Sequence, residues 1–372
     1  MSETRATDTE LMSVSIIAGP AATALLSKLD LPAFRGAQLP ATAEALDPAK
    51  LIEQISQIAS GGTTDHLFIL CEPERPPMAY ASLFAAPDAL AGVARLTSTA
   101  FAIGEDAFLE AILGGPACLM AEQMEFVDHI FFEPASDGTR WDLARSVASA
   151  LNPQAEIALL NEASAERWHE RRAGVFDFNG ALNTAGWRRL IDGEPLPLKT
   201  DSPVTALGYS ASRPFHPERF WNFLQHKSAG VFRAKGFFWL ASRMEQVGGL
   251  NLAGSEMHCA SAGLWWAARD EQTRHSEMPE TTRKQWRDPF GDRRQTFAVM
   301  ALKAERATLQ HQLDACLLTE AEMAGGPDSW SHFTDPFPSW AAHHTHDHVQ
   351  EHGHECGHDH GHDSEQHDCC HH

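Results

Sequence analysis

Metal-ligating side chains crowd the C-terminal end of the chain. Between residues 343 and 372 there are twelve histidines, three cysteines and seven acidic residues. Imidazole and thiolate are the ligands that Zn²⁺ prefers, and a carboxylate can fill a remaining position or orient an imidazole. We therefore predict that this tail binds Zn²⁺. Its candidate ligands are His343, His344, His346, His348, His352, His354, Cys356, His358, His360, His362, His367, Cys369, Cys370, His371 and His372.

A purification tag or a neutral solubilising run is the alternative interpretation of this tail. Tags are continuous histidine, and solubilising tails rarely contain a pair such as Cys369-Cys370. Ni²⁺, Co²⁺ and copper stay open as the bound ion, since the Irving–Williams order favours nickel and copper at such ligands. The tail has almost no aliphatic residues, so we predict that residues 341–372 are disordered and hold several exchangeable ions, as a metal buffer or loading arm would.

Four further cysteines lie in apolar stretches of the chain. They are Cys71, Cys118, Cys259 and Cys316, and we expect them to be buried thiols. His258 beside Cys259 could form a second metal site. A single pair of this kind is more often a matter of packing and surface, and we interpret it so.

Charge restricts the class of partner. The chain has 29 basic and 50 acidic residues, a formal net charge of −21, and no Lys or Arg follows Arg306. This balance argues against nucleic-acid and membrane partners, which select basic surfaces, and favours metal ions. The N-terminus lacks the order of a signal peptide, and no apolar run reaches the roughly 18 residues of a membrane helix. We expect a cytoplasmic protein.

The elements that precede the tail divide into two groups. Up to about residue 195, short apolar runs such as Val14–Ala18 and His66–Leu70 alternate with helical periodicity, as at Ala21–Leu29. This order predicts an α/β domain with a parallel sheet over residues 11–195. The proline-rich stretch Asp192–Pro203 predicts a linker.

Beyond the linker, the order of elements predicts an α+β domain over residues 204–320, with an antiparallel sheet covered on one side. Four tryptophans should supply much of its core, namely Trp221, Trp239, Trp265 and Trp266. The expected strands are Val204–Ser210, Gly230–Ala241 and Phe297–Leu302, and the expected helices are Pro217–His226 and Thr308–Leu318.

Blocks of sequence in both domains resemble the CobW family. Two in the first domain are Glu122–Asp128 (EQMEFVD) and Leu151–Ile157 (LNPQAEI). The family's members resemble metallochaperones, with a P-loop GTPase domain, a C-terminal domain and often a histidine-rich segment. The resemblance therefore implies zinc delivery or homeostasis, with an intact paralogue or a metalloprotein client as partner. Four blocks resemble the CobW C-terminal domain, namely Ser212–Phe220 (SRPFHPERF), Arg233–Arg243 (RAKGFFWLASR), Phe290–Gln295 (FGDRRQ) and Leu313–Thr319 (LDACLLT).

The phosphate-binding motif of that family is degenerate here. A P-loop needs a glycine-rich turn that ends in Lys and Ser/Thr, so that amides and an ammonium surround the phosphates. The turn Gly19–Thr23 is shorter, contains Pro20, and has Ala22 at the lysine position. Only Gly19 and Thr23 remain as a vestigial loop.

Three other family motifs are also missing. The magnesium-organising segment has Leu70 at its acidic position and Pro73 at its glycine position. Glu133–Ser136 replaces the guanine-reading N-K-x-D, and no cysteine before Cys71 could form the family's C-x-C-C motif. We predict a degenerate member that has lost GTP hydrolysis and does not use GTP or Mg²⁺. Two alternatives stay open: a weak GTPase that relies on Thr23 with Glu72 or Glu74, and a storage module without metal transfer.

Overall fold

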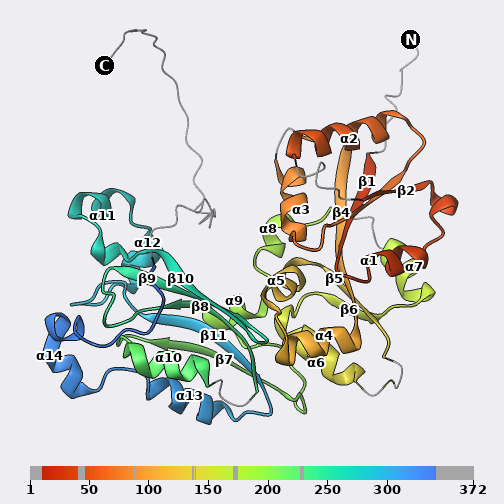
Figure 1. Cartoon of the computed structure of the whole chain (residues 1–372). Coiled ribbons are helices and arrows are strands. Elements are labelled where there is room, and N and C mark those ends of the chain that lie inside the picture. The colour runs from red at the N-terminus through yellow and green to blue at the C-terminus, as the bar shows by residue number, and fades with distance from the viewer. Residues whose placement is uncertain are drawn as a thin grey trace, which may run out of the picture.

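The computed structural model describes residues 11–40, 47–86, 89–135, 138, 140–170, 175–226 and 230–340. The predicted metal-binding tail, residues 341–372, and Ser136 lie outside these ranges. Within them the chain forms two sheets, one in each half of the sequence (Figure 1). The first half is followed by β7 at residue 204, and residues 192–203 before it form no helix or strand. The domain boundaries stated above stay predictions.

The first sheet has the strand order β2-β3-β1-β4-β5-β6, and every pair is parallel. The α/β prediction is confirmed, and the strand His66–Leu70 has the expected bounds. The strands are β1 (Met12–Ala18), β2 (Gly36–Pro40), β3 (His66–Leu70), β4 (Ala94–Gly104), β5 (His129–Glu133) and β6 (Glu156–Leu159).

Both faces of this sheet are covered by helices, as parallel sheets require. Leu25 of α1 and Trp168 of α7 pack on one face, whereas Leu51 of α2 and the α4–α6 group pack on the other. The helices are α1 (Ala22–Ser27), α2 (Pro48–Ser60), α3 (Pro77–Ala85), α4 (Glu105–Gly114), α5 (Cys118–Phe126), α6 (Trp141–Leu151), α7 (Glu162–Glu170), α8 (Phe178–Ala181) and α9 (Gly186–Ile191), with a 3₁₀ turn at Leu31–Phe34.

The second sheet has the order β10-β9-β8-β11-β7, and every pair is antiparallel, which confirms the α+β prediction. Trp239 and Trp265 are buried as predicted, whereas Trp221 and Trp266 are half-buried. The strands are β7 (Val204–Ala211), β8 (Val231–Phe238), β9 (Gln246–Ala253), β10 (Glu256–Leu264) and β11 (Gln295–Leu302). The helices are α10 (Pro217–Gln225), α11 (Glu271–Glu277), α12 (Glu280–Gln285), α13 (Arg306–Asp314) and α14 (Glu320–Trp330), with a 3₁₀ turn at Trp266–Ala268.

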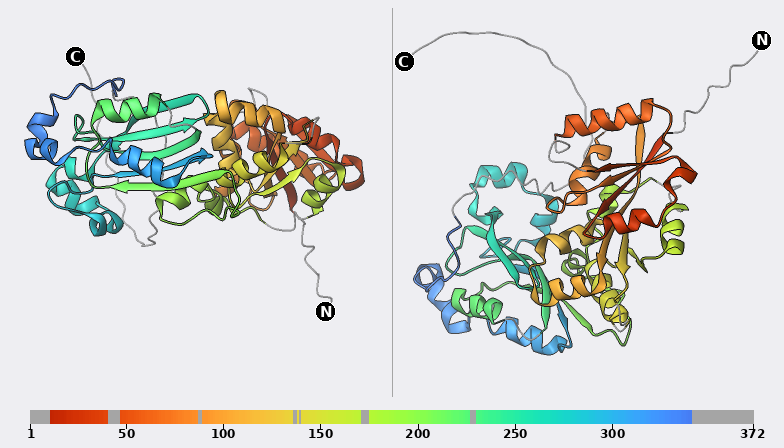
Figure 2. Two further views of the ribbon diagram at one scale, coloured as in Figure 1. Left: turned by 90° about the horizontal axis from the view of Figure 1, so that it is seen from below. Right: turned by 45° about the vertical axis from the view of Figure 1, so that its right-hand side comes forward.

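Coverage of the second sheet differs from the expectation. Helices α10 and α13 cover one face, but the other face is buried too, against α4, α5, α6 and α9 of the first half (Figures 1 and 2). One apolar cluster joins Phe108 and Val147 of the first half to Phe232, Ala298 and Met300 of the second. The two halves therefore share part of their interior.

The close approach of α9 to its neighbours depends on two glycines. A Cβ at Gly186 would lie 1.9 Å from the carbonyl oxygen of Ala150, and one at Gly208 would lie 2.0 Å from that of Leu190. Backbone atoms cannot move aside as a flexible side chain can. These glycines let α9 lie directly on α6 and β7. None of the helices in the described ranges has the length and apolar content that a membrane crossing requires.

Candidate functional site

The turn after β1 stands where a P-loop nucleotide-binding protein holds its phosphates. Gly19 has φ +95°, and a Cβ there would lie 2.3 Å from the carbonyl oxygen of Ala102 in β4. The Ala21 amide donates to that same oxygen at 3.0 Å, and the Ala22 amide donates to Gly19 O at 3.1 Å. The turn therefore packs on β4, and both of these amides donate to protein oxygens.

The side chains around this turn offer little to a nucleotide. Ala22 is buried at the position of the family's lysine, and Thr23 is exposed. Lys28 follows the six-residue helix α1 and lines an open depression of about 450 Å³ with Glu162 and Glu166 of α7. Two carboxylates against one ammonium disfavour a triphosphate in that depression.

The end of β3 carries the acids that might have replaced the missing magnesium ligand. The Glu72 carboxylate lies 3.7 Å from Arg75 Nε, and its amide donates to the Tyr80 hydroxyl at 3.3 Å. Glu74 is exposed on the following turn. Cys71 donates its amide to Ile17 O, and burial raises the pKa of its thiol. Cys71 and Glu72 are therefore held by contacts within the protein, whereas Glu74 lies at the surface.

A second cluster of ligand-type side chains lies between the two halves. Cys118 is the first residue of α5, whereas Glu256 and His258 lie on the edge strand β10. The Cys118 Sγ, a Glu256 carboxylate oxygen and a His258 ring nitrogen all lie within 4.8 Å of one another. No other such group of three is found in the described part of the chain. We call these three residues the interface site.

Backbone contacts between the halves hold the interface site together. The hairpin turn between β9 and β10 docks on the turn between α4 and α5, where the Ser255 amide donates to Gly115 O at 2.7 Å. Gly254, at φ +58°, forms a bridge with Pro116. The Cys118 amide donates to Glu256 Oε2 at 2.9 Å, which fixes the carboxylate over the start of α5.

A buried ion pair lies beside these contacts. Arg233 of β8 is fully buried and donates to both carboxylate oxygens of Glu125, at 2.7 and 3.1 Å, and to Asn251 Oδ1 at 2.7 Å. Lys235 lies 2.7 Å from Glu122, which also accepts from the Asn251 amide group. The polar side chains on this face of the second sheet therefore bind helix α5.

The pKa values of Cys118 and Glu256, which are neighbours in this site, are shifted in opposite directions. Burial, together with the nearby Glu256 charge, raises the pKa of the Cys118 thiol to about 11. The Cys118 amide and the His258 ring stabilise the carboxylate of Glu256 and lower its pKa. The site thus holds a protonated thiol beside an ionised carboxylate at neutral pH.

The sequence analysis placed His258 with Cys259 and treated both as packing. Successive residues of a strand point to opposite faces, so Cys259 packs into the second half's own core while His258 faces α5. The thiol that lies near His258 is that of Cys118, which sequence reasoning had classed only as a buried thiol. Cys118 and Cys316 are indeed buried, whereas Cys71 and Cys259 are half-buried.

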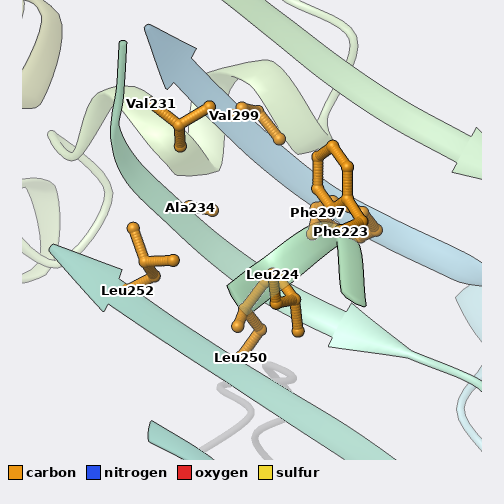
Figure 3. A pocket seen from close by; sticks show the side chains of 8 residues that line it. All are labelled: Phe223, Leu224, Val231, Ala234, Leu250, Leu252, Phe297 and Val299. Carbon is orange, nitrogen blue, oxygen red and sulfur yellow. The ribbon is translucent and has the colours of Figure 1, made fainter. Parts of the chain in front are cut away.

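His216 and a small apolar space beneath α10 are packing features. The His216 ring lies 4.6 Å from that of Phe333, and burial lowers its pKa, as suits an interior contact. A space of about 10 Å³ lies between α10 and the second sheet, lined by apolar side chains such as Leu224, Leu250 and Phe297 (Figure 3). A volume of this size holds at most one water molecule, and the lining side chains offer it no polar partner.

Comparison with known proteins identifies the second half. The model of the cobalamin synthesis protein cobW C-terminal domain matches residues 204–317. The zinc-regulated GTPase metalloprotein activator 1 of Dictyostelium discoideum is 30% identical over 225 residues, which cover 59% of this chain and 47% of that protein. Zinc chaperone Rv0106 of Mycobacterium tuberculosis is 36% identical over 154 residues, 41% of this chain and 38% of that protein. The chain thus spans less than half the length of these curated relatives.

A solved structure covers more of the chain. The Zn(II)-bound YjiA GTPase from E. coli aligns with 83% of this chain and 99% of its own, at 11% identity and a TM-score of 0.36. That likeness is too distant to place any side chain.

Proposed function

Because this chain belongs to the CobW family of zinc metallochaperones and GTPases, we propose that it handles zinc in metal homeostasis without hydrolysing GTP. Its role would be that of a metallochaperone or a metal buffer. Two relatives are named for zinc, and the tail of this chain supplies fifteen imidazole and thiol side chains. An intact family member or a metalloprotein client is the expected partner.

The single observation that supports the loss of GTP hydrolysis is the packed turn after β1. A phosphate needs free amides and a lysine ammonium at this point. The Ala21 amide is bonded to Ala102 O instead, and Ala22 is buried where the lysine would stand. To admit phosphates, the turn would have to leave β4, against which Gly19 is tightly fitted.

Nucleotide binding is the direct test of this half of the proposal. We expect a fluorescent GTP analogue to show no saturable binding at micromolar concentrations, with or without Zn²⁺, since the Ala21 and Ala22 amides are bonded to protein oxygens and no lysine stands at the family's position. Thr23→Ala serves as the matched variant, because Thr23 is the remaining family hydroxyl and is exposed. Micromolar binding that Thr23→Ala weakens would establish the alternative, an active GTP-binding zinc metallochaperone.

Zinc stoichiometry tests the other half. We expect a chain that ends at Trp340 to lose most of the zinc equivalents that titration calorimetry measures on the full chain. Trp340 is buried and stacks under Arg243 at 4.1 Å, so ending the chain after it keeps the described contacts. A full-length control with tail histidines changed to Asn and cysteines to Ser should behave like the shortened chain. Undiminished stoichiometry in either chain would contradict the tail assignment.

Transfer separates a metallochaperone from a store. Ligands that lie close together in sequence can pass an ion between overlapping sets, which favours handover over tight retention. Zinc uptake by a candidate client protein, compared between the zinc-loaded full chain and zinc-loaded small chelators of equal affinity, distinguishes the two roles.

A further inference from the structure

The interface site brings together the three side-chain types that zinc binds. A tetrahedral ion with ligands at about 2.0–2.3 Å keeps its donor atoms roughly 3.3–3.8 Å apart. The three donors already lie within 4.8 Å of one another. His258 Nε2 donates to Glu256 Oε1 at 2.8 Å, so a cation between them would take the place of this hydrogen bond. Side-chain rotations that move the donor atoms by about an ångström would complete the tetrahedral geometry.

The donors are held from both sides of the contact between the halves. Glu256 and His258 are two residues apart on β10 and therefore point to the same face. His258 is in register with Asn251, whose side chain is fixed by Arg233 and Glu122. Cys118 is fixed by burial and by the hydrogen bond that its backbone amide donates to the Glu256 carboxylate. Such support from neighbouring hydrogen bonds is what orients metal ligands in known sites.

Charge and exposure also suit a cation. Around the site, three carboxylates (Glu122, Glu125 and Glu256) face two cations (Arg233 and Lys235), which leaves a net charge of −1. The His258 side chain is 61% exposed and that of Glu256 33%, so an ion can enter from solvent. Cys118 is buried behind them. The site therefore has a closed side and an open side.

We propose that Cys118, Glu256 and His258 bind one zinc ion, with a fourth position open to water or to an exchanging ligand. The thiol proton leaves to solvent as the sulfur ligates the ion. Three protein ligands with one open position are the pattern of exchangeable or catalytic sites, whereas structural sites are closed by four. The inference goes beyond the tail and depends on the proposed function only for the identity of the metal.

Binding here joins the two halves of the chain. Cys118 belongs to the first half, and both other ligands belong to the second. The three come together only in the folded chain, since Cys118 and Glu256 are 138 residues apart. An ion at this site stabilises the folded state, because it binds that state alone. Tail ligands are neighbours in sequence and stay available when the body unfolds, so tail-bound zinc shifts stability little.

Thermal unfolding of the full chain with and without Zn²⁺ tests the proposal. With free zinc about 100-fold above the dissociation constant, we expect the midpoint to rise by roughly 3–5 °C. His258→Ala should abolish this rise and shift the midpoint without zinc only slightly, because the side chain is mostly exposed and loses one surface hydrogen bond, to Glu256. His275→Ala, an exposed histidine of the same half, is the matched control and should retain the rise.

A second variant guards against an indirect effect of His258. Glu256→Gln keeps an oxygen that can accept the Cys118 amide but removes the carboxylate charge, so it should also abolish the zinc-dependent rise. An equal rise in the parent chain, His258→Ala and Glu256→Gln would overturn the site, as would no rise in the parent chain. Calorimetric stoichiometry of the tail is a separate measurement, so its failure would count against the proposed function and not against this site.

Discussion

Replacing Arg233 by Met is expected to lower the free energy of unfolding by about 3–5 kcal/mol, measured by chemical denaturation. The Arg233 side chain is fully buried, and Glu125, its partner across the contact between the halves, is 6% exposed. Loss of the guanidinium leaves the buried carboxylate with only the more distant Lys235 ammonium, 3.9 Å away, as a counter-charge, and removes the donors to Asn251 Oδ1 and to the Leu252 carbonyl. Breaking one member of a buried pair is far more costly than replacing both.

Two further variants serve as controls for this measurement. Arg233→Met combined with Glu125→Leu should recover much of the lost stability, because no unpaired charge remains. Lys284→Met breaks the exposed pair with Glu280 and should cost less than about 1 kcal/mol. If Arg233→Met cost no more than Lys284→Met, the buried pair would not be stabilising the contact between the halves.

Substituting Ala for Gly254 is the second change with a large expected effect, a loss of about 2–5 kcal/mol. The residue has φ +58°, and a Cβ would lie 2.1 Å from Gly115 O and 2.4 Å from Ala111 O. Both are backbone atoms of the α4–α5 region, so the β9–β10 turn would have to move away from the first half. The interface site should lose its zinc-dependent stabilisation with it.

Gly62 provides the matched control for backbone strain alone. It has φ +63°, close to that of Gly254, and a Cβ there would meet nothing within 4 Å. Gly62→Ala should therefore cost about 1–2 kcal/mol, the price of the left-handed conformation. The difference between the two substitutions, from parallel denaturation curves, measures the steric conflict at the contact. Equal losses would mean that the turn adapts without separating the halves.

Much of the fold could be predicted from the sequence, because its strands are short apolar runs in regular order. His66–Leu70 is apolar after its first residue, and its first four residues are buried, so its bounds were clear. Strands β9 and β10 gave no such signal. β9 contains Gly248 and Gly249, and β10 is an edge strand whose last residues are exposed. β9 pairs with β8 and β10 pairs with β9, and this pairing depends on neighbours that a local sequence pattern does not contain.

The candidate site was predictable only where its chemistry is local. The tail can be predicted as a metal site because its ligand-type residues lie close together in sequence, and it stays a prediction. Pro20 and Ala22 mark the turn after β1 as a departure from the family motif in the sequence alone. The interface site was missed because nothing near Cys118 in sequence marks it as a ligand. Only the register of β10 and the docking of Gly254 on Gly115 bring His258 to it. That information belongs to the tertiary structure.

The apolar cluster that joins Phe108 and Val147 to Phe232 and Met300 makes the two halves one structural unit, and this has a consequence for how the sequence can be recombined. Exchange of the segment before residue 204 for a homologous one would replace one side of this shared interior, so we expect a recombination point in the linker to lower stability. The first half therefore has a structural role that does not depend on nucleotide chemistry. The first half supplies the apolar surface on which one face of the second sheet packs.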